Sequence, residues 1–529
     1  MNLRLGSSLW LLGLAVVAAC DSNNNSPPPI GIAPEPTVTA ADRLPGVDVE
    51  ITAVRGGSGP GGNLRVGDLL EVDFTLATND GDPLELSMFA RGAIMVSGPT
   101  FNYQRVIESQ SDLISAATKI ALGKYRYRFR VPIPAAYAAP INDTASFGTA
   151  DGEMTGQALL SGTYTVAIEA RKDYEIDSVL YRDPGNATAD FLLGDATALE
   201  AREVVTLANC NQCHGELNAH GNNRNKITNC LACHTSGAED GNDPASGNGT
   251  PGITIDFKVM IHKIHAGANL PSVNGVTTNP DGSRNYDATP TPYVIQGYRS
   301  SLVDFSEVAF PVWPSLAAGM PRDAGYSALS SSQRSQENAM LAGPVACAKC
   351  HGDPDDSGPA AAPAQGNLAY TQPSLQACSS CHDDWVLDHP YTSNGSTMPI
   401  QRDNAACKDC HRESGTPLDV IDAHRHPLLD AALAPGLVYD FPAITDVGNG
   451  NSRFEVGEKI HVQMTIKDKN GNDVAASSLL RLVSVLNGPT KNPVLLNYVR
   501  LDVAAMGSGP VYEFNLPTNY YYESVGSST

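Results

Sequence analysis

The chain has 529 residues and a formal net charge of −22. This length suggests three or four domains, and the negative charge, with no basic stripe along the sequence, argues against nucleic acid as a partner. Aromatic residues make up only 6% of the chain, whereas it has 48 glycines and 37 prolines. Loops and short strands fit this composition better than long helices do.

The N-terminus has the pattern of an export signal. In residues 1–20, Arg4 precedes an apolar run from Leu9, and small residues lead up to Cys20. The run is too short to span a bilayer in the mature protein. "VAAC" resembles the bacterial lipoprotein signal, in which the cysteine is cleaved free and lipidated; the alternative is an ordinary cleavage site beside a chance cysteine. Acyl chains on Cys20 would hold the protein at a membrane surface.

Two segments of different character follow. Residues 21–45 are polar and proline-rich and predict a flexible tether. Residues 46–190 alternate between apolar and polar side chains, as half-buried strands do. In "LLEVDFTLAT", every second residue from Leu70 to Leu76 is apolar, and "YRYRFRV" and "TYTVAIEA" repeat the pattern. We expect an antiparallel β domain, sandwich or barrel, with one face in water.

The cysteines share one spacing. Apart from Cys20, the other ten of the eleven cysteines form five Cys-x-x-Cys pairs, each followed directly by a histidine. The paired cysteines are Cys210, Cys213, Cys230, Cys233, Cys347, Cys350, Cys378, Cys381, Cys407 and Cys410. The histidines that follow them are His214, His234, His351, His382 and His411. No cysteine is left over, so the pattern does not arise by chance.

This spacing fits covalently bound haem. Two thiols three positions apart add to the two vinyl groups of one porphyrin, and the adjacent histidine then ligates the iron from the proximal side. A zinc ribbon has no reason to place histidine after every pair, and a redox dithiol has no reason to recur five times. Export also fits, because haem c is attached outside the cytoplasm. The sequence therefore predicts five covalently bound haem c groups.

Further histidines are candidates for the distal side of each iron. His262 and His265, in "DFKVMIHKIHAG", would share one face of a short helix that stops at Gly267, although two solvated histidines on a surface helix would show the same spacing. His424 and His426 compete for one iron, and we favour His424. The distal candidates are His220, His262, His265, His389, His424 and His426.

Five irons and five distal histidines predict six-coordinate, low-spin iron without methionine ligands. Such iron transfers electrons and has no open position for a substrate. The count therefore argues against a catalytic haem. No catalytic residue is predicted, and whether the protein has a broad metal-reductase activity stays open.

All five motifs lie in residues 195–428, a segment with little periodicity in which the porphyrins would form the core. Residues 435–529 return to a β pattern that repeats the first β domain. "VGEKIHVQMTIKDKNGNDV" from Val456 matches the segment from Val66 at an offset of 390. His461 then lies on the wet face of a strand, which removes it as a haem ligand.

The second β segment is shorter than the first. "YEFNLP" at Tyr512 matches "YRFRVP" at Tyr127, and only twelve residues follow Pro517. We therefore expect an incomplete copy of the first β domain, in a chain truncated from a β–haem–β–haem protein.

These residues resemble a known family, the outer-membrane decahaem c-type cytochromes of metal-reducing bacteria of the OmcA/MtrC type. The matching stretches, within residues 200–425, are "CNQCHGELNAHGNNR", "NCLACH", "DFKVMIHKIHAG", "DFSEVAFP" and "ACSSCHDD". The resemblance implies a multidomain fold in which antiparallel, Greek-key-like split-barrel β domains flank a loop-rich, short-helix pentahaem domain. It also implies bis-histidine haems, a lipid anchor at the cell surface, and electron supply from a porin–cytochrome conduit.

The sequence departs from this family in places. It has five motifs instead of ten, and its second β domain has no cysteine pair for a regulatory disulfide. Asp21, directly after Cys20, resembles an inner-membrane retention signal in some bacteria, which bears on sorting to the outer membrane.

Three functions fit these features. The leading hypothesis is an outer-membrane lipoprotein that relays electrons through its haems to extracellular acceptors such as iron or manganese oxides, flavins and soluble metal chelates. The alternative is a reductase of a small anion such as nitrite or tetrathionate, which would need a five-coordinate iron. The third is a non-catalytic scaffold whose β domains bind partners.

Overall fold

The structure is a computed structural model of the chain. It describes residues 31–39, 43–243, 248–297, 300–310, 322, 324–342, 347–352, 362–393, 395–411, 419–424, 436–448, 450, 454, 457–479, 481–488, 494–507 and 509–516. The predicted signal peptide, Cys20, Asp21 and His426 lie outside the described residues.

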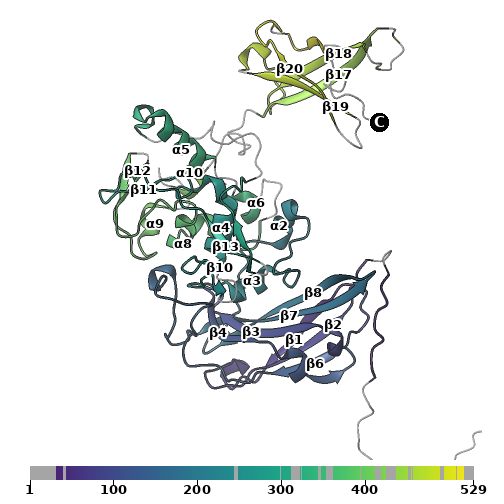
Figure 1. Ribbon diagram of the computed structural model, residues 1–529, viewed down its shortest axis with the longest axis vertical. Coiled ribbons are helices and arrows are strands. Elements are labelled where there is room, and N and C mark those ends of the chain that lie inside the picture. The colour runs from purple at the N-terminus through teal and green to yellow at the C-terminus, as the bar shows by residue number, and fades with distance from the viewer. Residues whose placement is uncertain are drawn as a thin grey trace, which may run out of the picture.

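The first domain consists of two antiparallel four-stranded sheets (Figure 1). One sheet has the order β1-β2-β6-β5, and the other has the order β4-β3-β7-β8. The strands are β1 (Asp48–Arg55), β2 (Glu71–Ala77), β3 (Arg91–Gly98), β4 (Gln104–Gln110), β5 (Thr118–Ala121), β6 (Lys124–Arg128), β7 (Gly162–Ile176) and β8 (Val179–Leu193), with the single-turn helix α1 (Leu113–Ala116) before β5.

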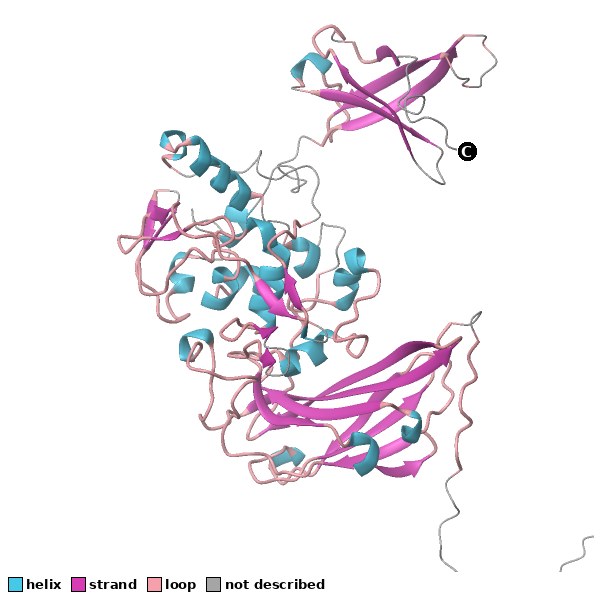
Figure 2. Ribbon diagram, in the orientation of Figure 1, coloured by secondary structure: helices cyan, strands magenta, loops and turns pink. Residues whose placement is uncertain are grey.

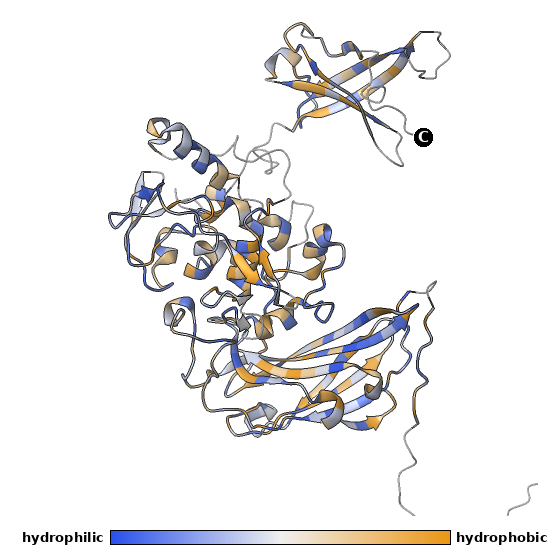
Figure 3. Cartoon of the chain, viewed as in Figure 1, coloured by the Kyte–Doolittle hydropathy of each residue, from blue (hydrophilic) through white to orange (hydrophobic). Residues whose placement is uncertain are grey.

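The core of this domain lies between the two sheets. Val72 and Phe74 of β2 belong to one buried cluster with Ile94, Val166 and Ile168 of the other sheet. Apolar and polar residues alternate along the strands (Figure 3), and the apolar ones point inward because only one face of each strand meets the core. The prediction of an antiparallel β domain from this alternation is confirmed.

The opposite face of the β1-β2-β6-β5 sheet carries a buried carboxylate. Arg126 Nε lies 2.5 Å from Asp73 Oδ1, and Arg55 Nε lies 2.8 Å from Asp73 Oδ2. The hydrogen bond from Arg126 is the largest cause that lowers the pKa of Asp73, to about 2, and the hydrogen bond from Arg55 adds to it. Asp73 is thus only 8% exposed at a position that alternation assigns to water.

Part of the segment before β1 lies against the first domain. Ala33 N donates a hydrogen bond to Glu85 Oε1 at 2.8 Å. Lys172 Nζ lies 2.7 Å from Glu35 Oε1, and the Lys172 side chain is 2% exposed. Because a buried ammonium needs a counter-charge, this contact holds Glu35 to the domain.

Short helices joined by loops make up the central region (Figure 2). The helices are α2 (Leu207–His214), α3 (Ile227–Cys233), α4 (Phe257–Ala266), α5 (Ser331–Leu341), α6 (Ala348–His351), α7 (Leu368–Thr371), α8 (Leu375–Ser379), α9 (Cys407–Cys410) and α10 (Val420–His424). Small hairpins pair β9 (Asn242–Asp243) with β10 (Asn248–Gly249), β11 (Thr277–Thr278) with β12 (Arg284–Asn285), β13 (Val294–Gln296) with β14 (Leu302–Asp304), and β15 (Tyr391–Ser393) with β16 (Ser396–Met398). Helix α3 packs on β3, β4, β7 and β8 of the first domain.

The C-terminal strands repeat part of the first domain. Strands β17 (Val438–Val447), β18 (Lys459–Lys467) and β21 (Tyr512–Leu516) form one sheet, and β19 (Leu482–Gly488) pairs with β20 (Val494–Leu501). His461 Nδ1 lies 3.1 Å from Asn515 Oδ1 on the neighbouring strand. Antiparallel β domains therefore flank the loop-rich helical region, and the predicted fold class is confirmed.

The structure corrects the predicted alignment of Tyr512 with Tyr127. Met464 pairs with Tyr512, just as Phe74 pairs with Tyr125. The Tyr512 hydroxyl accepts from Ala476 N at 2.9 Å, and the Tyr125 hydroxyl accepts from Leu86 N at 3.0 Å. Tyr512 thus corresponds to Tyr125 and not to Tyr127. The sequence pattern did not reveal this difference, because a shift of two residues keeps the same face of a strand inward and leaves the alternation unchanged.

The ion pairs of Asp73 lead to a stability prediction. The folded-state pKa of Asp73 is depressed, so its stabilising contribution is present above the ordinary carboxyl pKa and is lost as the pH falls toward about 2. We expect Asp73→Asn to lower the opening free energy of β2 and β6 by about 1–2 kcal/mol near neutral pH, measured by hydrogen–deuterium exchange.

Two comparisons test this explanation. The difference between wild type and Asp73→Asn should shrink as the pH falls from about 4 to about 2, because the wild-type carboxyl then becomes protonated too. Glu71→Gln, on the same strand, serves as the matched control, since the Glu71 carboxylate lies 3.7 Å from Arg128 and should contribute less. A difference that stays constant with pH would contradict the ion-pair explanation.

Candidate functional site

Each Cys-x-x-Cys pair begins on or next to one of the short helices α2, α3, α6, α8 and α9. Residues three positions apart lie on the same face of a helix, so the two cysteines of a pair that lies within a helix, as in α2 and α3, share one face. Thr206 and Ser374 begin α2 and α8, and their side chains accept hydrogen bonds from the backbone N–H groups of Asn209 and Ala377. No disulfide joins any of the ten paired cysteines.

The helix predicted around His262 and His265 is present as α4. Asp256 begins it by accepting a hydrogen bond from Lys258 N, and it ends at Gly267, which has φ of 41°. A Cβ atom on Gly267 would lie 2.3 Å from Val308 O. The predicted stop at Gly267 is therefore confirmed, and its cause is both the left-handed backbone and the lack of space.

Four pairs of imidazole rings lie close together in the central region. The distances between ring centroids are 5.8 Å for His220–His234, 6.1 Å for His214–His265, 6.1 Å for His262–His351 and 6.3 Å for His382–His424. In each pair, one ring belongs to a Cys-x-x-Cys-His motif and the other is a distal candidate. Sequence reasoning identified the two groups of histidines but left the pairing within them open.

These distances fit a metal ion between two imidazoles. A metal–nitrogen bond of about 2 Å, and about 1 Å more from nitrogen to ring centre, place the two ring centres about 6 Å apart. Rings in direct contact cover a wider range of about 4.5–7 Å, so distance alone does not decide between the two arrangements. The hydrogen bonds of the rings carry further information.

Four of the paired histidines have the same hydrogen bond at Nδ1. The partners are backbone carbonyl oxygens: Ile255 O at 2.8 Å for His234, Ile261 O at 2.8 Å for His265, Val204 O at 3.1 Å for His351, and Val420 O at 2.7 Å for His424. A carbonyl oxygen only accepts, so Nδ1 carries the proton and the lone pair is at Nε2. Histidines that ligate metals are oriented in this way.

Burial favours the neutral form of His220, His262 and His234 among these imidazoles. It is the largest cause that lowers the pKa of His220 and of His262 to about 4; the charge of Arg224 adds to the effect at His220, and His351 adds to it at His262. Burial also lowers the pKa of His234. Neutral imidazole is the form that binds a metal ion, so the arrangement suits ligation at neutral pH.

His389 is a distal candidate that stands apart from these pairs. Within the described part of the chain, no ring contact joins His389 to another imidazole; its Nδ1 is buried without a hydrogen-bond partner, and its Nε2 lies 3.8 Å from Asp388 Oδ1. His426 lies outside the described residues. His411 directly follows α9. The distal partner of His411 is therefore not assigned by geometry.

Polar contacts tie the motifs to one another. Lys263 Nζ, between His262 and His265 on α4, lies 2.6 Å from Asp383 Oδ2, directly after His382. Asn209 Nδ2, directly before the first motif, donates to the backbone oxygen of Cys350 in the third motif at 3.0 Å. Sequence reasoning missed both contacts, although the stretch "ACSSCHDD" contains Asp383.

Residues of the first β domain also reach the site, and sequence reasoning missed these as well. Glu169 Oε2 of β7 lies 2.6 Å from Arg224 Nε, in the segment between His220 and the second motif. Ser97 Oγ of β3 donates to Ala232 O at 2.6 Å. No spacing in the sequence signals these contacts, because they join strands to helices far along the chain.

Motif-bearing short helices and paired imidazoles together define the class of multihaem c-type cytochromes. Residues 202–425 match the family model described as "Outer membrane cytochrome MtrC/MtrF-like, domains II/IV". This match confirms the predicted resemblance of the segment to the outer-membrane cytochromes.

Two solved structures are similar to the chain. One is the outer membrane decaheme cytochrome OmcA, with 18% identity and a TM-score of 0.45; the match covers 87% of this chain and 57% of that one. The other is MtrC from Shewanella baltica OS185, with 15% identity and a TM-score of 0.45, covering 89% of this chain and 62% of that one. The chain thus spans less than two thirds of either protein. A search of curated proteins gives no match.

Gly267 leads to a prediction about α4. Gly267→Ala would bring Cβ to 2.3 Å from Val308 O, so α4 must shift or its last turn must open. We expect a loss of about 2–4 kcal/mol in the opening free energy of α4, measured by hydrogen–deuterium exchange.

Gly325→Ala is the matched control, since Gly325 also has a positive φ, 89°, but nothing lies within 4 Å of its Cβ position. The loss of opening free energy around Gly325 should be about 1 kcal/mol. Equal losses would contradict the steric explanation.

Proposed function

We propose that this protein is a multihaem c-type cytochrome that passes electrons through five covalently bound haem c groups to acceptors outside the cell. The observation that carries the proposal is the close approach of each described imidazole pair, in which one ring directly follows a Cys-x-x-Cys sequence. The match of residues 202–425 to an outer-membrane cytochrome family supports it.

The ten motif cysteines would attach the porphyrins, and the five histidines that follow them would be the proximal ligands. His220, His262, His265 and His424 would be distal ligands to the irons of His234, His351, His214 and His382. The fifth iron, at His411, would take His389 or His426. Haem iron held between two imidazoles exchanges single electrons and offers no open position to a substrate.

The chain's own residues would keep the haems in a fixed series. Helix α4 presents His262 to the third motif and His265 to the first. The Lys263–Asp383 ion pair ties the same helix to the fourth motif. One rigid element thus connects three of the five motifs, which keeps distances between neighbouring sites constant, as electron transfer requires.

We also propose the cellular setting. The chain would be exported, lipidated on Cys20 and held at the outer membrane, where it would receive electrons from a porin–cytochrome conduit and deliver them to iron or manganese oxides, flavins or soluble metal chelates. In the described residues, no helix is long and apolar enough to cross a membrane. The proposed division is a signal peptide (1–20), a tether (21–45), a β domain (46–190), a pentahaem domain (195–428) and a second, incomplete β domain (435–529).

The haem count tests this proposal directly. The exported protein should contain five haems per chain by pyridine haemochrome assay and intact mass, with low-spin spectra. After reduction, stopped-flow mixing with a soluble iron(III) chelate should reoxidise all of them. The double variant Cys347→Ala/Cys350→Ala should contain one haem fewer. A colourless protein, or one that holds zinc, would overturn the proposal.

The distal ligands can be tested one at a time. His424→Ala should leave a five-coordinate iron at His382, seen as one high-spin haem by electron paramagnetic resonance. For the fifth iron, one of the variants His389→Ala and His426→Ala should produce a high-spin signal and the other should not. His461→Ala, on the face of β18, is the control and should change no haem signal. A wholly low-spin His424→Ala variant would refute the pairing with His382.

A further inference from the structure

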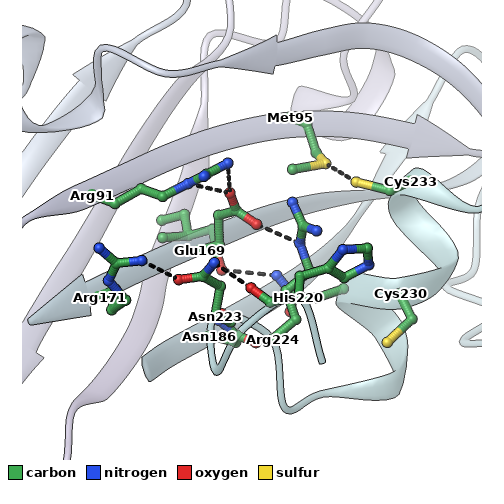
Figure 4. A network of polar contacts seen from close by, with 12 residues as sticks. Arg91, Met95, Glu169, Arg171, Asn186, His220, Asn223, Arg224, Cys230 and Cys233 are labelled. Atoms are coloured by element: carbon green, nitrogen blue, oxygen red, sulfur yellow. Dashed lines mark hydrogen bonds and ion pairs between the residues drawn. The ribbon is translucent and has the colours of Figure 1, made fainter. Parts of the chain in front are cut away.

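The segment that carries His220 is held by side chains of the first β domain (Figure 4). Arg171 Nη1 of β7 donates to Asn223 Oδ1 at 2.9 Å, and Asn186 Nδ2 of β8 donates to Asn223 O at 3.0 Å. Asn223 Nδ2 in turn donates to His220 O at 2.6 Å. His220 has a φ of 53°, which is uncommon for a residue with a side chain. The β domain therefore holds this strained residue in place.

The proximal side of the same imidazole pair is also attached to this domain. Asn229 Nδ2 of α3 donates to Ile168 O at 2.8 Å. Cys233 Sγ lies 3.1 Å from Met95 Sδ of β3. Together with the contacts of the preceding segment, these bonds place the His220–His234 pair directly on the β4-β3-β7-β8 sheet.

A buried group of charges lies at this contact. The Glu169 side chain is 2% exposed and lies between two guanidinium groups, with Arg224 Nε at 2.6 Å and Arg91 Nη2 at 3.2 Å. The charge of Arg171 is balanced by Asp173, whose Oδ1 lies 2.6 Å from Arg171 Nε. The group of Glu169, Arg224 and Arg91 therefore carries one net positive charge. Figure 4 shows Arg224 beside His220.

We propose that the Glu169–Arg224 pair sets the reduction potential of the haem between His220 and His234, so that the β domain controls electron transfer as well as supporting the site. This inference rests on the proposed function. The oxidised iron carries one more positive charge than the reduced iron. Arg224 therefore favours the reduced form and Glu169 favours the oxidised form, and both effects are strong because the pair is shielded from water.

The energetics of buried ions favour such a role over simple docking. Burying an ion pair costs desolvation energy that its attraction does not always repay, so such a pair is weak evidence for stability. Apolar side chains would attach the helices to the sheet at lower cost. Here a carboxylate and a guanidinium lie beside a ligand pair, where their charges act on the site.

Two variants should shift one potential in opposite directions. In a potentiometric titration of the full-length holoprotein, Arg224→Gln should lower the potential of one of the five components, and Glu169→Gln should raise it. We expect about a tenfold change in the reduced-to-oxidised ratio of that haem in each variant, about 59 mV for a one-electron couple. Arg224→Lys and Glu169→Asp should leave the potential close to that of the wild-type protein, because they keep the charge.

Arg91→Gln gives a second test should Arg224→Gln lose its haem, because Arg91 lies on β3, outside the segment that carries His220. It should lower the same potential by a smaller amount, since its side chain is 52% exposed. The matched control is Arg126→Gln, whose carboxylate partner Asp73 lies in the other sheet. This control should destabilise its own sheet and leave all potentials unchanged.

Unchanged potentials in the haem-replete Glu169→Gln and Arg91→Gln variants, or shifts of the same sign in both, would overturn the inference and leave the contact with a structural role only. Failure of the proposed function is detected separately. It would appear in the wild-type protein as absent haem, before any potential is measured.

Discussion

The site depends on the hydrogen bond that four of the eight paired histidines make from Nδ1 to a backbone carbonyl, because that bond determines which nitrogen can bind a metal. His265 and His424 bond to the carbonyl four residues earlier, within their own helices, whereas His234 and His351 bond to loops far along the chain. The orientation of the rings is thus built partly into short helices and partly into loop packing. This explains how a region with little periodic structure can hold its ligands in register.

The three parts of the chain contribute unequally to this arrangement. The first β domain has its own apolar core and supports the second motif through direct contacts with α3 and with the segment around His220. The central region has a smaller buried cluster around Leu270 and Tyr293, so the proposed porphyrins would supply apolar packing there. Stability and ligation are therefore coupled most closely where the sheet and the helices meet.

Much of the fold could be predicted from local patterns, but contacts over long separations could not. The alternation around Val72 and the stop at Gly267 are local effects of strand and helix geometry. Asp73 was predicted to face water, yet two arginines from neighbouring strands cover it. The candidate ligands followed from spacing, while the pairing of His262 with His351 depends on loop packing across almost ninety residues. The predicted alignment of Tyr512 was wrong by two residues, because a period of two cannot detect a shift of two.

The contact between Lys172 and Glu35 has a consequence for how far the molecule can move. Eleven peptide steps separate Cys20 from Gly31, where the described chain begins, and a fully stretched chain covers at most about 3.6 Å per step. If acyl chains held Cys20 in a bilayer, Gly31 could lie no more than about 40 Å from Cys20. The tether would then keep one edge of the first β domain near the lipid headgroups and would restrict how far the helical region can move.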